Sequence, residues 1–139
     1  MTIRIGRSND IALCRTLRHI VFVQEQHVPL SDEIDDLDEA STHLIAHDAH
    51  QPVGTARITL AGGVAKIGRV CVLPSHRGTG LGAALIRQGL EVATAQGATQ
   101  AKLGAQTHAL GFYEKLGFVA TGPVYDDAGI PHRDMVRGL

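Results

Sequence analysis

The chain has 139 residues, 44% of them hydrophobic and 19% charged, which is ordinary for a globular protein and predicts a single domain over residues 1–139. Its formal net charge of −1 creates no global field that would attract nucleic acid or an anionic membrane. We expect neither a membrane span, which needs an apolar run of roughly 20 residues, nor a signal peptide, and the two cysteines, Cys14 and Cys71, indicate reduced thiols in a cytoplasmic protein.

The first elements are a short strand and a helix. Apolar and polar residues alternate over residues 2–6, which predicts a half-buried strand. Ser8, Asn9 and Asp10 then offer N-cap chemistry for a helix that begins at Ile11 and ends near Gln24.

An acidic run follows from Asp32 to Glu39, with only Ile34 and Leu37 as apolar residues inside it. The pattern allows two interpretations. The carboxylates could attract a cationic amine, or the run could be a solvated surface loop, and charge runs favour the second interpretation.

The remaining elements alternate in a way that predicts an α/β fold. Strands are expected over residues 42–48, 53–60, 64–72, 100–105, 118–124 and 131–136, and helices over residues 81–96 and 108–116. The strand at Val70, the helix 81–96 and the strand at Leu103 form a βαβ unit, whereas most other neighbouring strands look antiparallel. The sequence therefore predicts a mixed, mostly antiparallel sheet flanked by helices.

A glycine-rich loop lies between the strand 64–72 and the helix that opens at Leu81. Gly78, Gly80 and Gly82 leave the backbone N–H groups unscreened, and the helix start adds its positive dipole end. Arg77 adds a positive charge with a planar fork that suits phosphate oxygens. The loop lacks the lysine of a Walker A loop and the spacing of a dinucleotide-binding GxGxxG, so those nucleotide sites are excluded.

Two motifs together resemble the GNAT family of acyl-CoA N-acyltransferases. Arg77-x-x-Gly80-x-Gly82 is similar to the family's pyrophosphate-binding signature, and Gln106-x-x-Ala109-x-x-x-Tyr113-x-x-x-Gly117-Phe118 is similar to its NxxAxxxYxxxGF segment. Further blocks resemble the ElaA-like branch of the family: VFVQEQ at residues 21–26, IGRV at 67–70, LGAQTH at 103–108, FYEKLGF at 112–118 and GIPHRDM at 129–135. The resemblance thus covers nearly the whole chain.

The resemblance implies a GNAT fold in which the strand before the loop carries a bulge and splays from the next parallel strand. Acetyl-CoA would enter this opening, and a backbone N–H near Cys71 or Val72 would polarise the thioester carbonyl. The implied cofactor-binding residues are Val70, Cys71, Val72, Arg77, Gly78, Thr79, Gly80, Leu81, Gly82, Ala83, Gln106 and Phe112. Gln106 stands where the broad family has asparagine.

The resemblance also implies that Tyr113 is the general acid that protonates the departing thiolate, and the pKa values of a phenol (~10) and a thiol (~8.5) suit that transfer. A base for the acceptor amine is less defined: Glu25 is the candidate we select, and His108, His132, Asp126 and Asp127 are alternatives. We expect no metal, because strand geometry would not gather His43, His47 and His50.

The sequence therefore predicts an N-acetyltransferase that transfers an acetyl group to a primary amine of a small molecule or peptide within a ternary complex. The alternative is an acyl-CoA-binding sensor without turnover. A homodimer through paired sheet edges is a further expectation.

Overall fold

The computed structural model describes residues 2–139. Its strands are β1 (Ile3–Ser8), β2 (Thr42–Asp48), β3 (Gln51–Ala61), β4 (Val64–Val72), β5 (Gln100–Gln106), β6 (Val119–Asp127) and β7 (Ile130–Gly138). Its helices are α1 (Ile11–Arg18), α2 (Leu30–Glu33), α3 (Leu81–Ala95) and α4 (Leu110–Glu114), with shorter turns η2 (Pro74–His76) and η3 (Thr107–Ala109) and a π-helical segment η1 (His19–Glu25). Within residues 2–139 no helix has both the length and the apolar character needed to cross a membrane.

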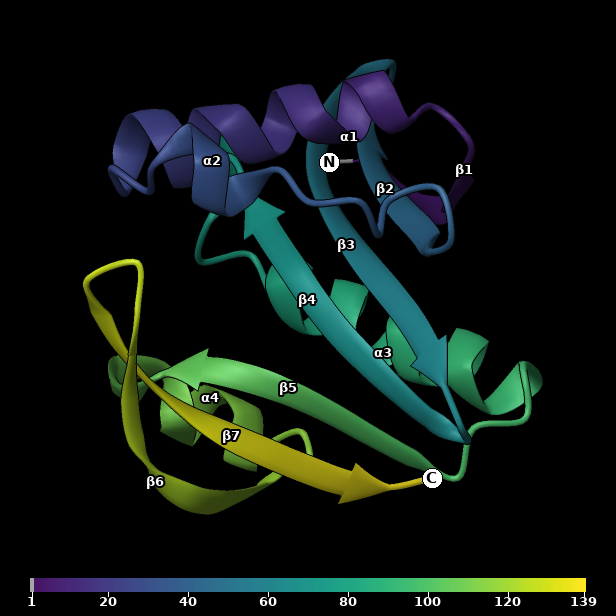
Figure 1. Cartoon of the computed structure of the whole chain (residues 1–139). Coiled ribbons are helices and arrows are strands. Elements are labelled where there is room, and N and C mark those ends of the chain that lie inside the picture. The colour runs from purple at the N-terminus through teal and green to yellow at the C-terminus, as the bar shows by residue number, and fades with distance from the viewer. Residues whose placement is uncertain (1) are drawn as a thin grey trace.

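The strands form one sheet in the order β1-β2-β3-β4-β5-β7-β6 (Figure 1). Among the strands of the described residues, only β4 and β5 are parallel, and their register pairs run from Val64–Gln100 to Lys66–Lys102. Beyond Lys66 the two strands diverge (Figure 1). The prediction of a mostly antiparallel sheet with one splayed parallel pair is confirmed.

Alternating side chains give the sheet two buried faces. On one face Leu44, Ile58 and Ile67 pack with buried residues of α3 in the larger core. On the other face Ile45 and Cys71 pack against Leu17 and Val21, which come from α1 and η1. Burial of each large aliphatic side chain contributes about 1.5–3 kcal/mol, so the sheet is fixed between α3 and the N-terminal helix.

A bulge in β4 lies just beyond the place where β4 and β5 separate. The register between β3 and β4 shifts between Thr55 and Arg57, and Arg69 opposite this shift has φ +51. A positive φ is rare for a residue with a side chain and bends the strand locally. The bulge expected from the family resemblance is therefore present, and it turns Arg69 toward α2.

The helix expected from Ile11 to near Gln24 is confirmed: α1 begins after Asp10, whose side chain accepts a 3.0 Å hydrogen bond from Leu13 N, and the helical path continues as η1 to Glu25. Other element boundaries differ from the predicted ones. The helix expected over residues 108–116 is instead a 3-10 turn followed by the short α4. β6 and β7 are longer than predicted because the turn at Ala128 (φ 53) and Gly129 (φ 80) lets the strands pair up to it.

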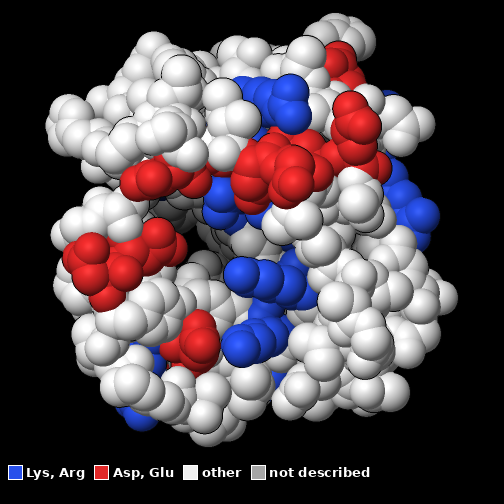
Figure 2. Space-filling view, in the orientation of Figure 1, with Lys and Arg blue, Asp and Glu red and all other residues white. Residues whose placement is uncertain are grey.

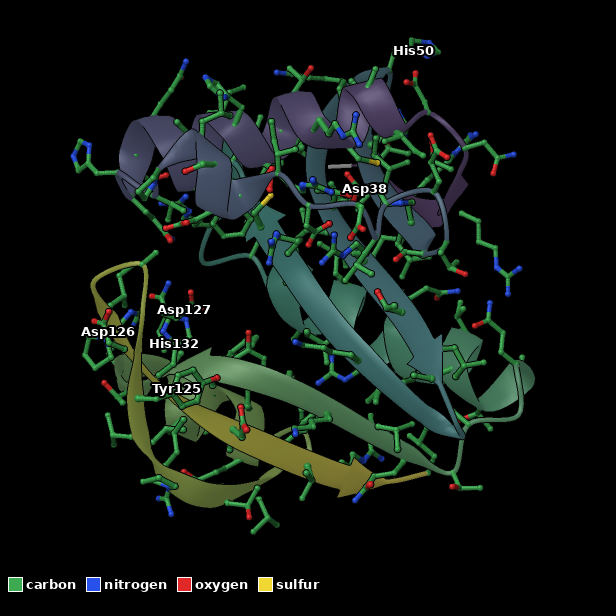
Figure 3. All side chains as sticks on the ribbon, in the orientation of Figure 1. Asp38, His50, Tyr125, Asp126, Asp127 and His132 are labelled. Atoms are coloured by element: carbon green, nitrogen blue, oxygen red, sulfur yellow. The ribbon has the colours of Figure 1, made fainter. Side chains whose placement is uncertain are left out.

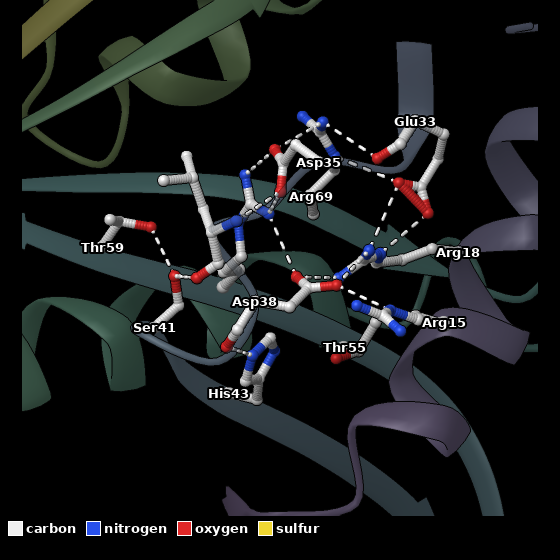
Figure 4. Close-up of polar contacts among 12 residues, drawn as sticks. Arg15, Arg18, Glu33, Asp35, Asp38, Ser41, His43, Thr55, Thr59 and Arg69 are labelled. Atoms are coloured by element: carbon white, nitrogen blue, oxygen red, sulfur yellow. Dashed lines mark hydrogen bonds and ion pairs between the residues drawn. The ribbon is translucent and has the colours of Figure 1, made fainter. Parts of the chain in front are cut away.

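The acidic run is not a fully solvated loop, and that interpretation was wrong for two of its carboxylates. Glu33 and Asp38 are buried, with relative exposures of 4% and 1%. They face the arginines of the neighbouring elements rather than water (Figure 4). A buried carboxylate needs a paired cation, which the pattern of the run itself does not contain.

The buried network joins four arginines to three carboxylates. Arg18 donates to Glu33 (3.0 Å) and Asp38 (2.8 Å), and Arg57 donates to Asp35 (2.8 Å) and Asp38 (3.1 Å). Arg15 and Arg69 complete the set through Asp38 and Glu33, respectively. Burial opposes ionisation of Asp38, but hydrogen bonds from the arginines outweigh it and hold its pKa well below the usual range. The network therefore ties α1, the acidic run and the sheet together.

Candidate active site

A cavity of about 590 Å³ lies beside the end of β4. Val70, Cys71 and Val72 form one wall, and Arg77 and Gln106 complete it. These five residues are all among the cofactor-binding residues expected from the sequence. Because β4 has no register partner on β5 beyond Lys66, this part of the strand offers backbone groups to an extended ligand.

The glycine loop leads directly into α3. Gly78 and Gly80 have φ values of 74 and 82, a left-handed conformation that favours glycine. Gly80 is the N-cap of α3 and has no side chain to cap it. The first N–H groups of the helix, from Leu81 to Ala83, therefore point toward the loop without intrahelical partners. This is an anion-binding arrangement.

Three other predicted cofactor-binding residues near the loop have side chains that stabilise the loop, pack in the core or border the start of α3. The Thr79 hydroxyl donates to His76 O at 2.7 Å, so it stabilises the loop. The side chain of Leu81 is buried in the core, which leaves only its backbone for a ligand. The Phe112 ring is 42% exposed and lies close to Gly82, where an added Cβ would be 3.7 Å from its Cζ atom. Phe112 therefore borders the start of α3.

Glu25 and Arg77 form a bidentate ion pair across the first cavity, with Arg77 donating to Glu25 Oε1 at 2.6 Å. The hydrogen bonds from Arg77 lower the pKa of Glu25. A carboxylate held this way is a poorer proton acceptor, and Glu25 does not border the cavity that contains Tyr113. The ion pair thus brings together two predicted site residues in an arrangement that the sequence did not suggest.

Cys71 is 5% exposed, and burial raises the pKa of its thiol to about 12. The nucleophilic form of cysteine is the thiolate, which this environment disfavours. The side chain packs with Leu17, Val21 and Ile45. Cys71 can therefore contribute its backbone to the cavity but not a reactive sulfur.

A second cavity of about 450 Å³ adjoins the first, and both are bordered by Val70 and Gln106. Tyr113 borders this second cavity. Its ring packs edge-on against Phe112 and Phe118, at centroid distances of 5.0 and 6.1 Å. Burial raises the pKa of Tyr113, so its hydroxyl keeps its proton at neutral pH.

The β6–β7 hairpin supplies the far wall of the second cavity (Figure 3). His132 Nδ1 lies 2.8 Å from Ile130 O, and since a carbonyl only accepts, Nδ1 carries the proton. When the ring carries only this proton, Nε2 can accept another. Tyr125 stacks on this ring at 5.9 Å and donates to Asp134 at 2.8 Å.

The other candidate bases are distributed between the two cavities and the surface. Asp127 borders the second cavity, whereas Asp126 accepts a hydrogen bond from Gly129 N in the hairpin turn. His108 borders the first cavity and bonds Gln106 at 2.7 Å. Of the candidates, His132 and Asp127 therefore share a cavity with Tyr113.

Two of the histidines considered for a metal are separated along β2. His43 is buried and bonds Asp38 O at 2.7 Å, and His47 lies four residues further along the strand, about 13 Å at the ~3.3 Å rise of a strand residue. Residues 2–139 contain no group of three or more His, Cys, Asp or Glu side chains placed to hold a metal ion.

Among the residues of the second cavity that sequence reasoning missed are Lys66, Lys102, Tyr125 and Asp134. Lys66 and Lys102 are two of only three lysines in the chain, and Tyr125 is one of two tyrosines. The rarity of these residue types could have drawn attention to them. That their side chains meet at one cavity depends on the strand register, which the sequence does not show.

Comparison with known proteins shows a consistent relationship. Residues 16–139 match the family model described as an acetyltransferase (GNAT) domain. The N-acetyltransferase YjcF of Bacillus subtilis is 44% identical over 123 residues, which cover 87% of each chain.

Solved structures agree with this relationship. The crystal structure of Escherichia coli ElaA superposes with a TM-score of 0.88 at 32% identity, covering 98% of this chain and 99% of that one. A Bacillus subtilis acetyltransferase, solved in complex with CoA, has a TM-score of 0.78 at 18% identity and covers 99% of each chain. At that identity the second likeness concerns the fold alone.

Proposed function

The chain belongs to the GNAT family of acetyltransferases, and on that premise we propose that it transfers an acetyl group from acetyl-CoA to a primary amine of a small molecule or peptide. Membership supports an acyltransferase that depends on acyl-CoA. The proposal adds the direct attack of the amine within a ternary complex and the residues that assist it.

The observation that carries this proposal is the meeting of two cavities at Val70 and Gln106. One cavity is bordered by Arg77, which directly precedes the glycine loop, and the other is bordered by Tyr113. Two substrates bound separately would therefore place their reacting ends at a common boundary, which is what direct transfer requires.

The first cavity is the site that we propose for CoA. The N–H groups at the start of α3 and the Arg77 guanidinium suit a pyrophosphate, and the unpaired edge of β4 at Val70 and Val72 suits an extended pantetheine arm. Acetyl-CoA, when bound, supplies the acetyl group as an activated thioester. The N–H of Cys71 or Val72 would stabilise negative charge on the carbonyl oxygen.

The second cavity contains both proton-transfer groups of the proposal. Tyr113 retains its proton because burial raises its pKa, so it can protonate the departing thiolate. His132 carries its proton on Nδ1, which leaves Nε2 to accept a proton from the acceptor amine. We therefore propose His132 as the base in preference to Glu25, whose carboxylate is held by Arg77.

The proposed function is tested by incubating the purified protein with acetyl-CoA and a panel of primary amines, and measuring release of free CoA thiol. We expect release that depends on both substrates. CoA binding without release for any amine would instead indicate a sensor.

Replacement of Arg77 tests the cofactor half of the site. We expect Arg77→Ala to weaken CoA binding by about tenfold, because it removes a charge-assisted hydrogen bond to phosphate at a partly exposed position. Glu25→Gln is the matched variant: it removes the competing ion pair and should strengthen CoA binding several-fold. Both dissociation constants can be measured by calorimetry, and unchanged affinity in Arg77→Ala would rule out this role.

A further inference from the structure

One end of the second cavity carries a pair of lysines. Lys66 on β4 and Lys102 on β5 are partners in the parallel register, at the last paired position before the strands diverge, and both border the cavity. Like charges on adjacent strand positions repel each other. The chain thus places two ammonium groups side by side at the narrow end of the opening.

The carboxylates of the protein compensate this charge only in part. Asp134 Oδ2 lies 3.7 Å from Lys102 Nζ, and its other oxygen accepts the hydrogen bond from Tyr125. Over residues 2–139, Lys66 takes part in no ion pair. Arg69, the next basic residue along β4, is already paired with acidic-run carboxylates. Positive charge is therefore in excess here, and Figure 2 shows basic side chains along one wall of the hollow.

The opposite end of the cavity has the reverse charge. Gln106, which pairs with His132, lies four residues from Lys102 along β5, about 13 Å at the ~3.3 Å rise of a strand residue. The hairpin beyond this pair carries Asp127, which also borders the cavity. Figure 2 shows acidic side chains on this side of the hollow, where Figure 3 labels Asp126 and Asp127. The two ends of the cavity therefore carry opposite charges.

We infer that the acceptor is an amine that also carries an anionic group, a carboxylate or a phosphate, at some distance from its nitrogen. Lys66 and Lys102 bind the anion, and the ammonium group enters at the Asp127 end, where His132 removes its proton. This inference rests on the proposed function. A neutral tail would leave the lysine pair uncompensated, and a second ammonium group would be repelled by it.

Four acceptors of matched length test the inference: ε-aminocaproate, the phosphate ester of aminohexanol, hexylamine and hexamethylenediamine. For the wild-type protein we expect kcat/KM for the better anionic amine to exceed that for hexylamine by about tenfold or more, since a charge-assisted contact has that order of effect. The comparison of the two anionic amines distinguishes carboxylate from phosphate. Lys66→Met and Lys102→Met should each lower the preference ratio about tenfold, mainly through KM.

Lys115→Met is the matched control, because Lys115 is exposed and borders neither cavity. It should leave the ratio unchanged. Equal efficiency with hexylamine, or an unchanged ratio in the Lys66→Met/Lys102→Met variant, would overturn the inference while leaving the proposed function intact.

A binding measurement separates the inference from the proposed function. ε-Aminocaproate is titrated into the CoA-bound protein, and the backbone amide resonances of β4 and β5 are followed by NMR. Binding that is lost in the double lysine variant, without CoA release for any amine, would support the anion site and reject acetyl transfer. Absence of binding in the wild-type protein would reject the anion site.

Discussion

Replacement of Tyr113 by phenylalanine is expected to lower kcat for acetyl transfer by about 10²- to 10⁴-fold, the usual contribution of a positioned general acid. The change removes only the hydroxyl. The ring keeps its edge-on packing against Phe112 and Phe118, so the fold and the dissociation constant for CoA should change little. Steady-state kinetics with any accepted amine measures the effect.

The pH dependence provides a check on the same role. Because burial raises the pKa of Tyr113, the protonated form needed for an acid persists throughout the neutral range, and its ionisation should not limit the rate until strongly alkaline pH. If Tyr113→Phe retained more than about a tenth of kcat, the proton on the departing sulfur would have to come from another group.

Replacement of Asp38 by alanine is expected to lower the free energy of unfolding by about 3–5 kcal/mol, because it leaves the buried Arg18 and Arg57 with one carboxylate partner each and so leaves positive charge in the network uncompensated. Asp38 binds Arg18, Arg57 and Arg15 at once. Urea denaturation followed by circular dichroism measures the change. Asp36→Ala is the matched control, since Asp36 belongs to the same acidic run but is exposed, and an exposed substitution should stay within about 0.5 kcal/mol.

The sign of the pH effect follows from the lowered pKa of Asp38. A carboxyl group whose pKa is lower in the folded state stabilises the fold above its unfolded value of about 3.9, and this contribution is lost as pH falls through the lower folded value. The wild-type protein should therefore lose more stability than Asp38→Ala when the pH falls below about 3.9, the unfolded pKa of the carboxyl group. Equal losses of stability in Asp38→Ala and Asp36→Ala at neutral pH would show that the buried network is not what holds the acidic run.

The sequence predicted the features that depend on local pattern. Strand alternation and the βαβ unit predicted a mixed, mostly antiparallel sheet, and the two motifs that resemble the GNAT family predicted its splayed parallel pair. These signals are readable because each is set by neighbours within a few residues or by a motif of fixed spacing.

The features that the sequence did not predict depend on contacts between distant segments. Asp38 is stabilised by Arg18 and Arg57, which lie 20 and 19 residues away. A run of acidic residues has the same sequence pattern whether its carboxylates are solvated or paired with distant arginines. The lysine pair depends on where the register of β4 and β5 begins. A shift of one residue would point the two side chains to opposite faces.

The short parallel pairing between β4 and β5 divides the sheet into two sub-sheets, β1–β4 and β5–β7, joined by a seam that ends at Lys66–Lys102. The larger core spans both parts, through residues such as Ile67 and Met135. An extended ligand that bonds the inner edges of both parts would close this seam with new backbone hydrogen bonds, and its binding free energy would add to the cohesion of the sheet. The free energy with which such a ligand binds would then also oppose separation of the two sub-sheets along the seam.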